Sequence, residues 1–194
     1  MASTRPVILM VVGLEPFIRD AVMLQPEGEL TEAACTLWER TASNVLRADC
    51  GELVFACPKG VMEAWLTERF PERARIVVQG RAPARRLMSV LNEAWRRRYQ
   101  PCVLIGGSGG DIPAGYFQQA FDTLRPGTEA ADVVLGPAAD GSCYLLGLRW
   151  KEPALFTDPA QESPPVVRRL QERATMLGLR VYLLPEWPGN PVPP

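Results

Sequence analysis

The stretch CVLIGGSGGD, residues 102–111, places four apolar or small residues directly before a run of glycines around one serine. A continuous apolar run is typical of a strand buried on both faces, and small residues let the following loop approach a ligand closely. Residues 7–13, VILMVVG, repeat the arrangement of an apolar run that ends in glycine. Both stretches therefore predict interior strands of one sheet, each followed by a loop.

Outward from these two runs, apolar strands alternate with amphipathic helices. We predict further strands at 53–57, 75–79, 133–135, 143–148 and 181–184, and helices at 31–47, 61–70, 83–99, 113–124 and 166–177. Long helices between strands imply βαβ units and a mostly parallel sheet covered on both faces. We therefore expect a single-domain α/β three-layer sandwich over residues 1–184. Residues 185–194 are rich in proline, and we expect them to form an extended, poorly packed tail.

The composition excludes several classes of protein. Hydrophobic residues make up 47% and charged residues 22% of the 194 residues, which excludes a disordered chain, a coiled coil and a collagen-like repeat. The net charge of −1 provides no overall field for nucleic acid or an anionic membrane, so we expect neither partner. Histidine is absent, which removes imidazole bases, Ser-His-Asp triads and His-ligated metals.

The five cysteines are scattered and form no C-x-x-C pair. A zinc ribbon or a thioredoxin-like motif is therefore unsupported, and we expect reduced cysteines with structural roles and no disulfide bond. The apolar run at 7–13 is too short to span a membrane and lacks a signal-peptide cleavage pattern. We expect a cytoplasmic protein.

Two loops stand out, because open α/β sheets bind ligands beyond the carboxyl ends of their strands. The backbone of the loop 106–111 could hold a phosphate, but its sequence matches neither a P-loop nor a dinucleotide-binding pattern, so a turn without function is the alternative. Asp140-Gly141 lies between two apolar runs and predicts a hairpin turn. Its functional interpretation is a carboxylate that faces the cleft and holds a metal or a sugar hydroxyl.

Two segments carry a family resemblance: VLIGGSGGDIP at 103–113 and ADVVLGPAADGSCYLLGL at 131–148. They resemble small bacterial glycosyltransferase-like proteins of the GT-A fold, the radical-SAM/selenodomain-associated transferases. These are distant relatives of the nucleotidyltransferases that load guanylyl groups onto molybdenum cofactor or phospholactate. Weaker similarity covers nearly the whole chain. The resemblance implies a GT-A-like, nucleotide-diphospho-sugar transferase fold, with a nucleotide or a nucleotide-sugar as ligand.

The chain departs from this family where the family's enzymes bind metal and phosphate. The family's loop Gly-Ser-Asp-x-Pro supplies an acidic metal ligand, and Ser108 stands at that position here. A neutral hydroxyl cannot replace a carboxylate on Mg²⁺ or Mn²⁺. The family's Gly-x-x-Lys-Thr-Arg-Leu phosphate loop corresponds to Ala21–Leu24, which has no lysine. Near the C-terminus, Glu186–Asn190 replaces an Asp-x-Asp stretch.

Two hypotheses follow. In the first, the domain has lost or altered its metal-dependent catalysis and keeps a cleft that binds a ligand or partner. In the second, it is an active glycosyl- or nucleotidyltransferase with altered metal dependence, and only then does it use a divalent cation. The candidate catalytic residues are Asp111 and Asp140; the candidate ligand-binding residues are Gly13, Arg81, Gly106, Gly107, Ser108, Gly141 and Ser142. We assign no metal ligand and no cofactor, and we expect no ordered divalent metal in the cleft.

Overall fold

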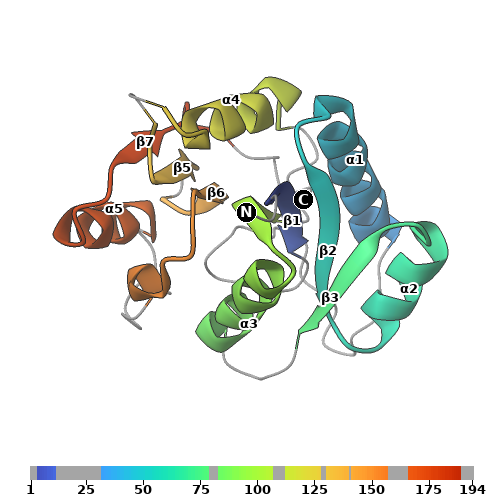
Figure 1. The fold of residues 1–194 in the computed structure, drawn as a ribbon. Helices are drawn as coiled ribbons and strands as arrows, with labels where there is room; N and C mark the ends of the chain where they lie inside the picture. Colours follow the sequence, from blue (N-terminus) through green and yellow to red (C-terminus); the bar gives the residue numbers. More distant parts are fainter. Residues whose placement is uncertain are drawn as a thin grey trace.

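The computed structural model describes residues 4–11, 32–78, 83–106, 112–127, 130–139, 141–156 and 166–188. One seven-stranded sheet runs through the molecule in the order β3-β2-β1-β4-β6-β5-β7 (Figure 1). The strands are β1 (Arg5–Val11), β2 (Glu52–Pro58), β3 (Ala74–Val78), β4 (Tyr99–Gly106), β5 (Val133–Pro137), β6 (Cys143–Leu148) and β7 (Val181–Leu183). The helices are α1 (Glu32–Ala48), α2 (Val61–Arg69), α3 (Pro83–Arg96), α4 (Ala114–Leu124) and α5 (Val166–Met176), with a 3₁₀ turn η1 (Pro153–Phe156).

The sheet is mostly parallel, as predicted. β1 lies parallel to β2 and β4, β2 to β3, and β5 to β7. β6 runs antiparallel to both of its neighbours, β4 and β5, because a tight turn joins it to β5. The expected α/β sandwich with a mostly parallel sheet is thus confirmed.

Each face of the sheet has its own apolar layer, because successive side chains of a strand point to opposite faces. Along β1, Val7 and Leu9 join the layer under α3, α5 and η1, and Ile8 and Met10 join the layer under α1, α2 and α4 (Figure 1). The helices supply the other half of each layer from residues spaced along one side. They include Leu87, Val90, Leu91, Leu155 and Leu170 on the first face and Trp38, Leu66, Phe117 and Phe121 on the second.

One local expectation is wrong. The helix predicted to run to Tyr99 ends at Arg96, because Arg98 takes a left-handed conformation with φ 64° and Tyr99 already belongs to β4. The tail predicted from residue 185 is described as far as Pro188: Pro185, Glu186 and Pro188 are exposed, as expected, and the residue between them is anchored. Trp187 pairs with Ala138 beside β5, and its side chain is partly buried against the second layer. Residues 189–194 lie outside the described residues. No helix among the described residues is long and apolar enough to cross a membrane.

Candidate functional site

The carboxyl ends of the central strands meet at one edge of the sheet. Val11 ends β1 and pairs with Gly106, which ends β4. Pro137 ends β5 at the same edge and pairs with Cys143, the first residue of the antiparallel β6. Both conspicuous loops, 107–111 and 138–142, therefore leave the sheet from this edge, where open α/β folds bind their ligands.

The connection between β5 and β6 is the predicted hairpin turn. The Gly141 N–H donates to the Ala138 carbonyl over 2.9 Å, and the Ala138 N–H donates to the Ser142 carbonyl over 2.9 Å. Gly141 has φ 80°, a left-handed conformation that glycine adopts without steric cost. Ser142 is buried, with 8% of its surface exposed. The turn prediction is confirmed.

Two other segments hold this turn in place. The Val167 N–H in the first turn of α5 donates to the Gly141 carbonyl over 3.4 Å. From the C-terminal side, the Trp187 carbonyl accepts a bond from the Ala139 N–H over 3.3 Å, and the Trp187 N–H donates to the Pro137 carbonyl over 2.9 Å. The turn is thus fixed by backbone bonds from two other segments, and a site built on it starts from a rigid frame.

Next to this turn, the ring of Tyr144 on β6 packs against Gly136 on β5. A Cβ at Gly136 would lie 2.5 Å from Cζ of Tyr144, so only glycine leaves room for this ring. The buried Tyr144 hydroxyl donates to the Pro185 carbonyl over 3.0 Å. Burial raises the pKa of Tyr144 well above its ordinary value, so the phenol stays neutral and remains a donor. We did not predict either residue, although a glycine inside an apolar strand commonly marks such a close approach.

The predicted site residues divide into two groups. Gly106, Gly141 and Ser142 lie at the carboxyl edge, at the ends of β4 and of the β5–β6 turn. The other predicted residues fall outside the described residues, so the structure neither joins nor separates them. They are Gly13, Arg81, Gly107, Ser108, Asp111 and Asp140.

The described part of the edge offers backbone groups and one serine rather than a metal centre. Among the described residues, no group of three His, Cys, Asp or Glu side chains is placed to hold a metal ion. The two candidate carboxylates, Asp111 and Asp140, lie outside the described residues. In the described turn, the N–H groups of Ala138, Ala139 and Gly141 already donate to carbonyl groups of the chain, so this turn serves as a frame for the adjoining loops.

The five cysteines are free thiols. Burial raises the pKa of Cys102 and of Cys143 to about 12, so both remain protonated and unreactive at neutral pH. Cys143 begins β6 at the candidate site, but its thiol donates to the Leu145 carbonyl over 2.9 Å. It is a structural residue rather than a nucleophile.

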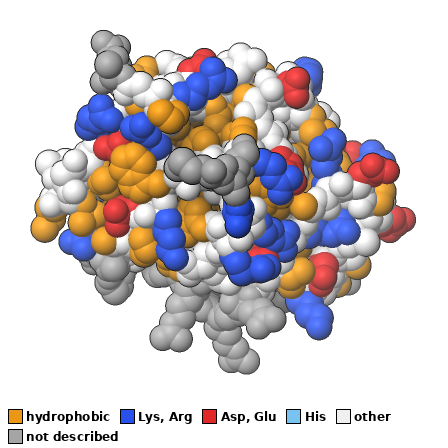
Figure 2. Space-filling view, in the orientation of Figure 1, with side chains coloured by type: hydrophobic (Ala, Val, Ile, Leu, Met, Phe, Trp, Pro, Cys, Tyr) orange, Lys and Arg blue, Asp and Glu red, His pale blue; other side chains and the backbone are white. Residues whose placement is uncertain are grey.

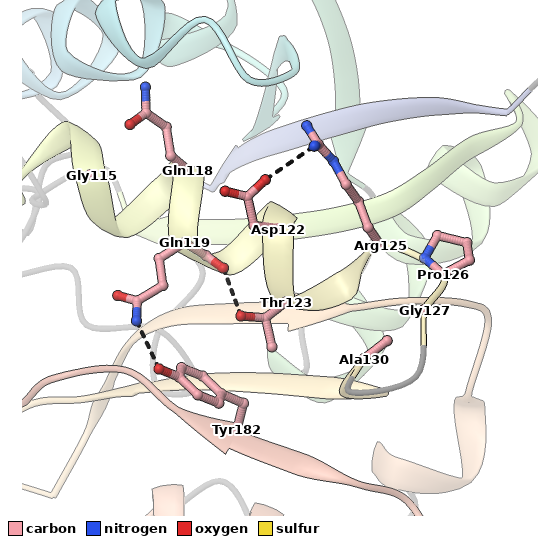
Figure 3. Close-up of a pocket in the computed structure, with 10 residues that line it drawn as sticks. All are labelled: Gly115, Gln118, Gln119, Asp122, Thr123, Arg125, Pro126, Gly127, Ala130 and Tyr182. Carbon is pink, nitrogen blue, oxygen red and sulfur yellow. Dashed lines mark hydrogen bonds and ion pairs between the residues drawn. The ribbon is translucent and has the colours of Figure 1, made fainter.

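An open groove of about 720 Å³ lies elsewhere, along α4 and β7 (Figure 3). The Gln119 amide donates to the Tyr182 hydroxyl over 2.7 Å across it, and Asp122 pairs with Arg125 over 3.3 Å. Arg125, Pro126 and Gly127 follow the C-terminal end of α4, so the groove extends toward the opposite edge of the sheet from the β5–β6 turn. It is therefore separate from the candidate site.

Residues 41–160, more than half of the chain, match a family described as "Uncharacterized protein conserved in bacteria (DUF2064)". No curated protein matches the chain.

Solved structures resemble the whole fold. A protein assigned as a nucleotide-diphospho-sugar transferase from Desulfovibrio desulfuricans G20 superposes with a TM-score of 0.73 at 23% identity, over 95% of this chain and 81% of that chain. Rv0371C from Mycobacterium tuberculosis H37Rv, in complex with manganese, gives 0.56 at 12% identity, over 95% and 90%. A CMP:2-keto-3-deoxy-manno-octonic acid synthetase complexed with CTP gives 0.58 at 12%, over 95% and 92%. At these identities the likeness shows the fold alone.

Proposed function

The chain belongs to the DUF2064 family, and we propose that it binds a nucleotide or a nucleotide-linked sugar at the carboxyl edge of its sheet without metal-dependent transfer. The observation that carries this proposal is the convergence of Gly106 with the rigid β5–β6 turn at one edge. Ligands of open α/β sheets occupy this position. The synthetase of the same fold that was solved with CTP supports a nucleotide as the ligand class.

The proposed contacts follow from the residue types at this edge. The glycines of the 106–110 loop present backbone N–H groups to a phosphate, which they can approach closely because they lack side chains. Arg81, which precedes α3 in the sequence, supplies a guanidinium that pairs with a phosphate in two-point geometry. Asp140, from the sequence of the β5–β6 turn, accepts hydrogen bonds from sugar hydroxyls.

The loss of metal-dependent transfer is inferred from the sequence. Ser108 stands where the resembled GT-A family has an acidic ligand, and Ala21–Leu24 stands where that family has a cationic phosphate loop. Transfer from a nucleotide diphosphate needs such charges to stabilise the leaving group. The proposal includes a distant relationship of this chain to the nucleotidyltransferases that load guanylyl groups onto molybdenum cofactor. The competing hypothesis, an active transferase, is favoured by the two acids that remain, Asp111 and Asp140.

Calorimetry with UDP-, GDP- and CDP-linked sugars, each with and without Mn²⁺, tests the proposal. We expect one of these ligands to bind equally well in both conditions. The Asp140→Asn variant should weaken that binding, and the matched control Asp122→Asn on the outer surface of α4 should not. Binding that requires Mn²⁺, or product formed from the nucleotide-sugar, would favour the active transferase. No binding of any of the three would refute the proposed ligand class.

A further inference from the structure

A group of cations lies at the amino edge of the sheet, opposite the proposed nucleotide site. We call Arg5, Arg96, Arg97, Arg98 and Lys151 the basic rim. Arg5 begins β1, the three consecutive arginines end α3 and lead into β4, and Lys151 follows β6. The backbone N–H of Arg5 donates to the Arg98 carbonyl over 3.2 Å, which joins two of these segments directly. Figure 2 shows Lys and Arg side chains gathered near the centre of the view, around the place where Figure 1 marks the N-terminus.

Three acidic side chains next to these cations already have partners. Glu93 accepts bonds of 2.7 Å from both Arg96 and Arg97, which lower its pKa to about 2. Glu52 pairs with Arg5 over 3.2 Å and accepts a 2.6 Å bond from the Tyr99 hydroxyl. Glu152, next to Lys151, accepts a bond of 3.1 Å from the Ala154 N–H. These acids cannot neutralise all five cations of the basic rim.

Arg98 is the member whose position most needs an explanation. It follows the end of α3 with φ 64°, and its backbone N–H donates to the Trp95 carbonyl over 3.0 Å. Glycine or asparagine is favoured at such a helix end, because a side chain in the left-handed conformation is strained. The Arg98 side chain is exposed, and no described residue forms a hydrogen bond or ion pair with its guanidinium. Two backbone bonds hold this conformation, from the Arg98 N–H to the Trp95 carbonyl and from the Arg5 N–H to the Arg98 carbonyl, and the guanidinium itself stays available to a partner.

Aromatic rings orient two of the other cations. The Arg5 guanidinium lies 5.1 Å from the centre of the Tyr99 ring, and the Lys151 ammonium lies 5.6 Å from the centre of the Trp95 ring. A cation over the face of an aromatic ring is held in position, and the Lys151 ammonium keeps its N–H groups available for an anion. The basic rim is therefore a partly ordered set of donors rather than five independent flexible charges.

We propose that the basic rim docks an acidic segment of a protein partner, whose Asp and Glu side chains pair first with Arg98 and Lys151, the two cations that Glu52 and Glu93 do not hold. Glu52, Glu93 and Glu152 lie between the cations and would repel a continuous phosphate backbone, but separate carboxylates can be spaced to avoid them. Because the basic rim and the proposed nucleotide site occupy opposite edges, this inference stands independently of the proposed function.

A fluorescein-labelled oligoglutamate is the probe, followed by fluorescence anisotropy at low ionic strength. A labelled single-stranded oligonucleotide and phosphatidylserine vesicles are the comparison ligands. The test variant, Arg98→Gly with Lys151→Gln, removes two cations from the basic rim. The matched control, Arg69→Gln with Arg168→Gln, removes two exposed cations from α2 and α5.

We expect the oligoglutamate to bind in a salt-dependent manner and to bind more weakly to the test variant, by about two- to fivefold for each cation removed. The control should bind like the unmodified protein. Arg98→Gly alone should raise the Tm, because it relieves the strained backbone; a lower Tm would refute the strain argument. The proposal is overturned if the oligoglutamate does not bind, if the control loses as much affinity as the test variant, or if the oligonucleotide or the vesicles bind more tightly.

Discussion

Replacing Gly136 by alanine should destabilise the protein through a single steric conflict. The φ of Gly136 lies outside the left-handed region, so alanine fits the backbone itself. The new Cβ would meet the Tyr144 ring at 2.5, 2.6 and 2.9 Å, which is far inside van der Waals contact. The ring must therefore move, and its hydroxyl would lose the 3.0 Å bond to the Pro185 carbonyl.

The expected cost combines these two effects. Overpacking of a tight interior costs about 1–3 kcal/mol, and a lost hydrogen bond costs about 0.5–1.5 kcal/mol. We therefore expect Gly136→Ala to lower the free energy of unfolding by about 2–4 kcal/mol. For a chain of this size, that corresponds to a fall in Tm of about 5–15 °C.

Thermal and urea unfolding, with a matched substitution, measure the effect. Gly115 lies on the exposed side of α4, and a Cβ added there would have no atom within 4 Å, so Gly115→Ala should stabilise the helix by up to about 1 kcal/mol. Adding Tyr144→Ala to Gly136→Ala should make the cost of the alanine nearly vanish, because the opposing ring is gone. If Gly136→Ala is as stable as the unmodified protein, the packing behind the β5–β6 turn is wrong. An undiminished cost in the Tyr144→Ala background would show that the cause lies elsewhere.

Three further predictions concern side chains outside the candidate site. Asp132→Asn should lower the free energy of unfolding, measured in urea, by about 2–3 kcal/mol. The buried carboxylate accepts a 2.9 Å bond from the Arg180 N–H and lies 3.5 Å from the guanidinium groups of Arg149 and Arg180. An unchanged unfolding midpoint would contradict this. A thiol reagent should modify Cys102 and Cys143 only after unfolding, when all five thiols react, and rapid modification of either in the native protein would contradict their burial. The pKa of Glu93 in the folded protein is lowered to about 2, so its ion pairs stabilise the protein above the unfolded pKa, and this stabilisation is lost as the pH falls through about 2. Glu93→Gln should therefore lower the free energy of unfolding by under about 1 kcal/mol at neutral pH and leave it unchanged below about pH 2.

Most of the fold was predictable because the interior strands are continuous apolar runs. Their residues, from Val7 to Val11 and from Cys102 to Ile105, are almost wholly buried, so burial on both faces left a direct signal in the sequence. The Asp-Gly pair likewise predicted the β5–β6 turn. These features depend on local composition, which a single sequence displays.

The features that were missed depend on contacts between distant parts of the chain. The end of α3 is set by the left-handed Arg98, a residue type that gives no warning of a helix end. Trp187 is held by backbone bonds to β5, about 50 positions earlier, which outweigh the proline content around it. Position 136 on β5 has to be glycine because the Tyr144 ring on β6 packs against it. The sequence alone does not give these spatial partners.

The candidate site was predicted to the level of the sheet edge. Strand order and direction bring the loops 107–111 and 138–142 to one edge, and this follows from the alternation of strands and helices. The roles of Ser108, Asp111 and Asp140 remain predictions, because these residues lie outside the described part of the chain. Binding measurements on substituted variants test these roles.

Titration of Mn²⁺ by calorimetry into the unmodified protein and into Ser108→Asp tests the central claim most directly. With a serine in place of the family's acidic ligand, the unmodified protein should show no tight, stoichiometric binding. The Ser108→Asp variant should bind Mn²⁺ more tightly at an unchanged Tm, because an added carboxylate supplies the anionic oxygen that the ion prefers. Tight, stoichiometric Mn²⁺ binding by the unmodified protein that disappears in Asp140→Asn would contradict the account and establish a working metal site.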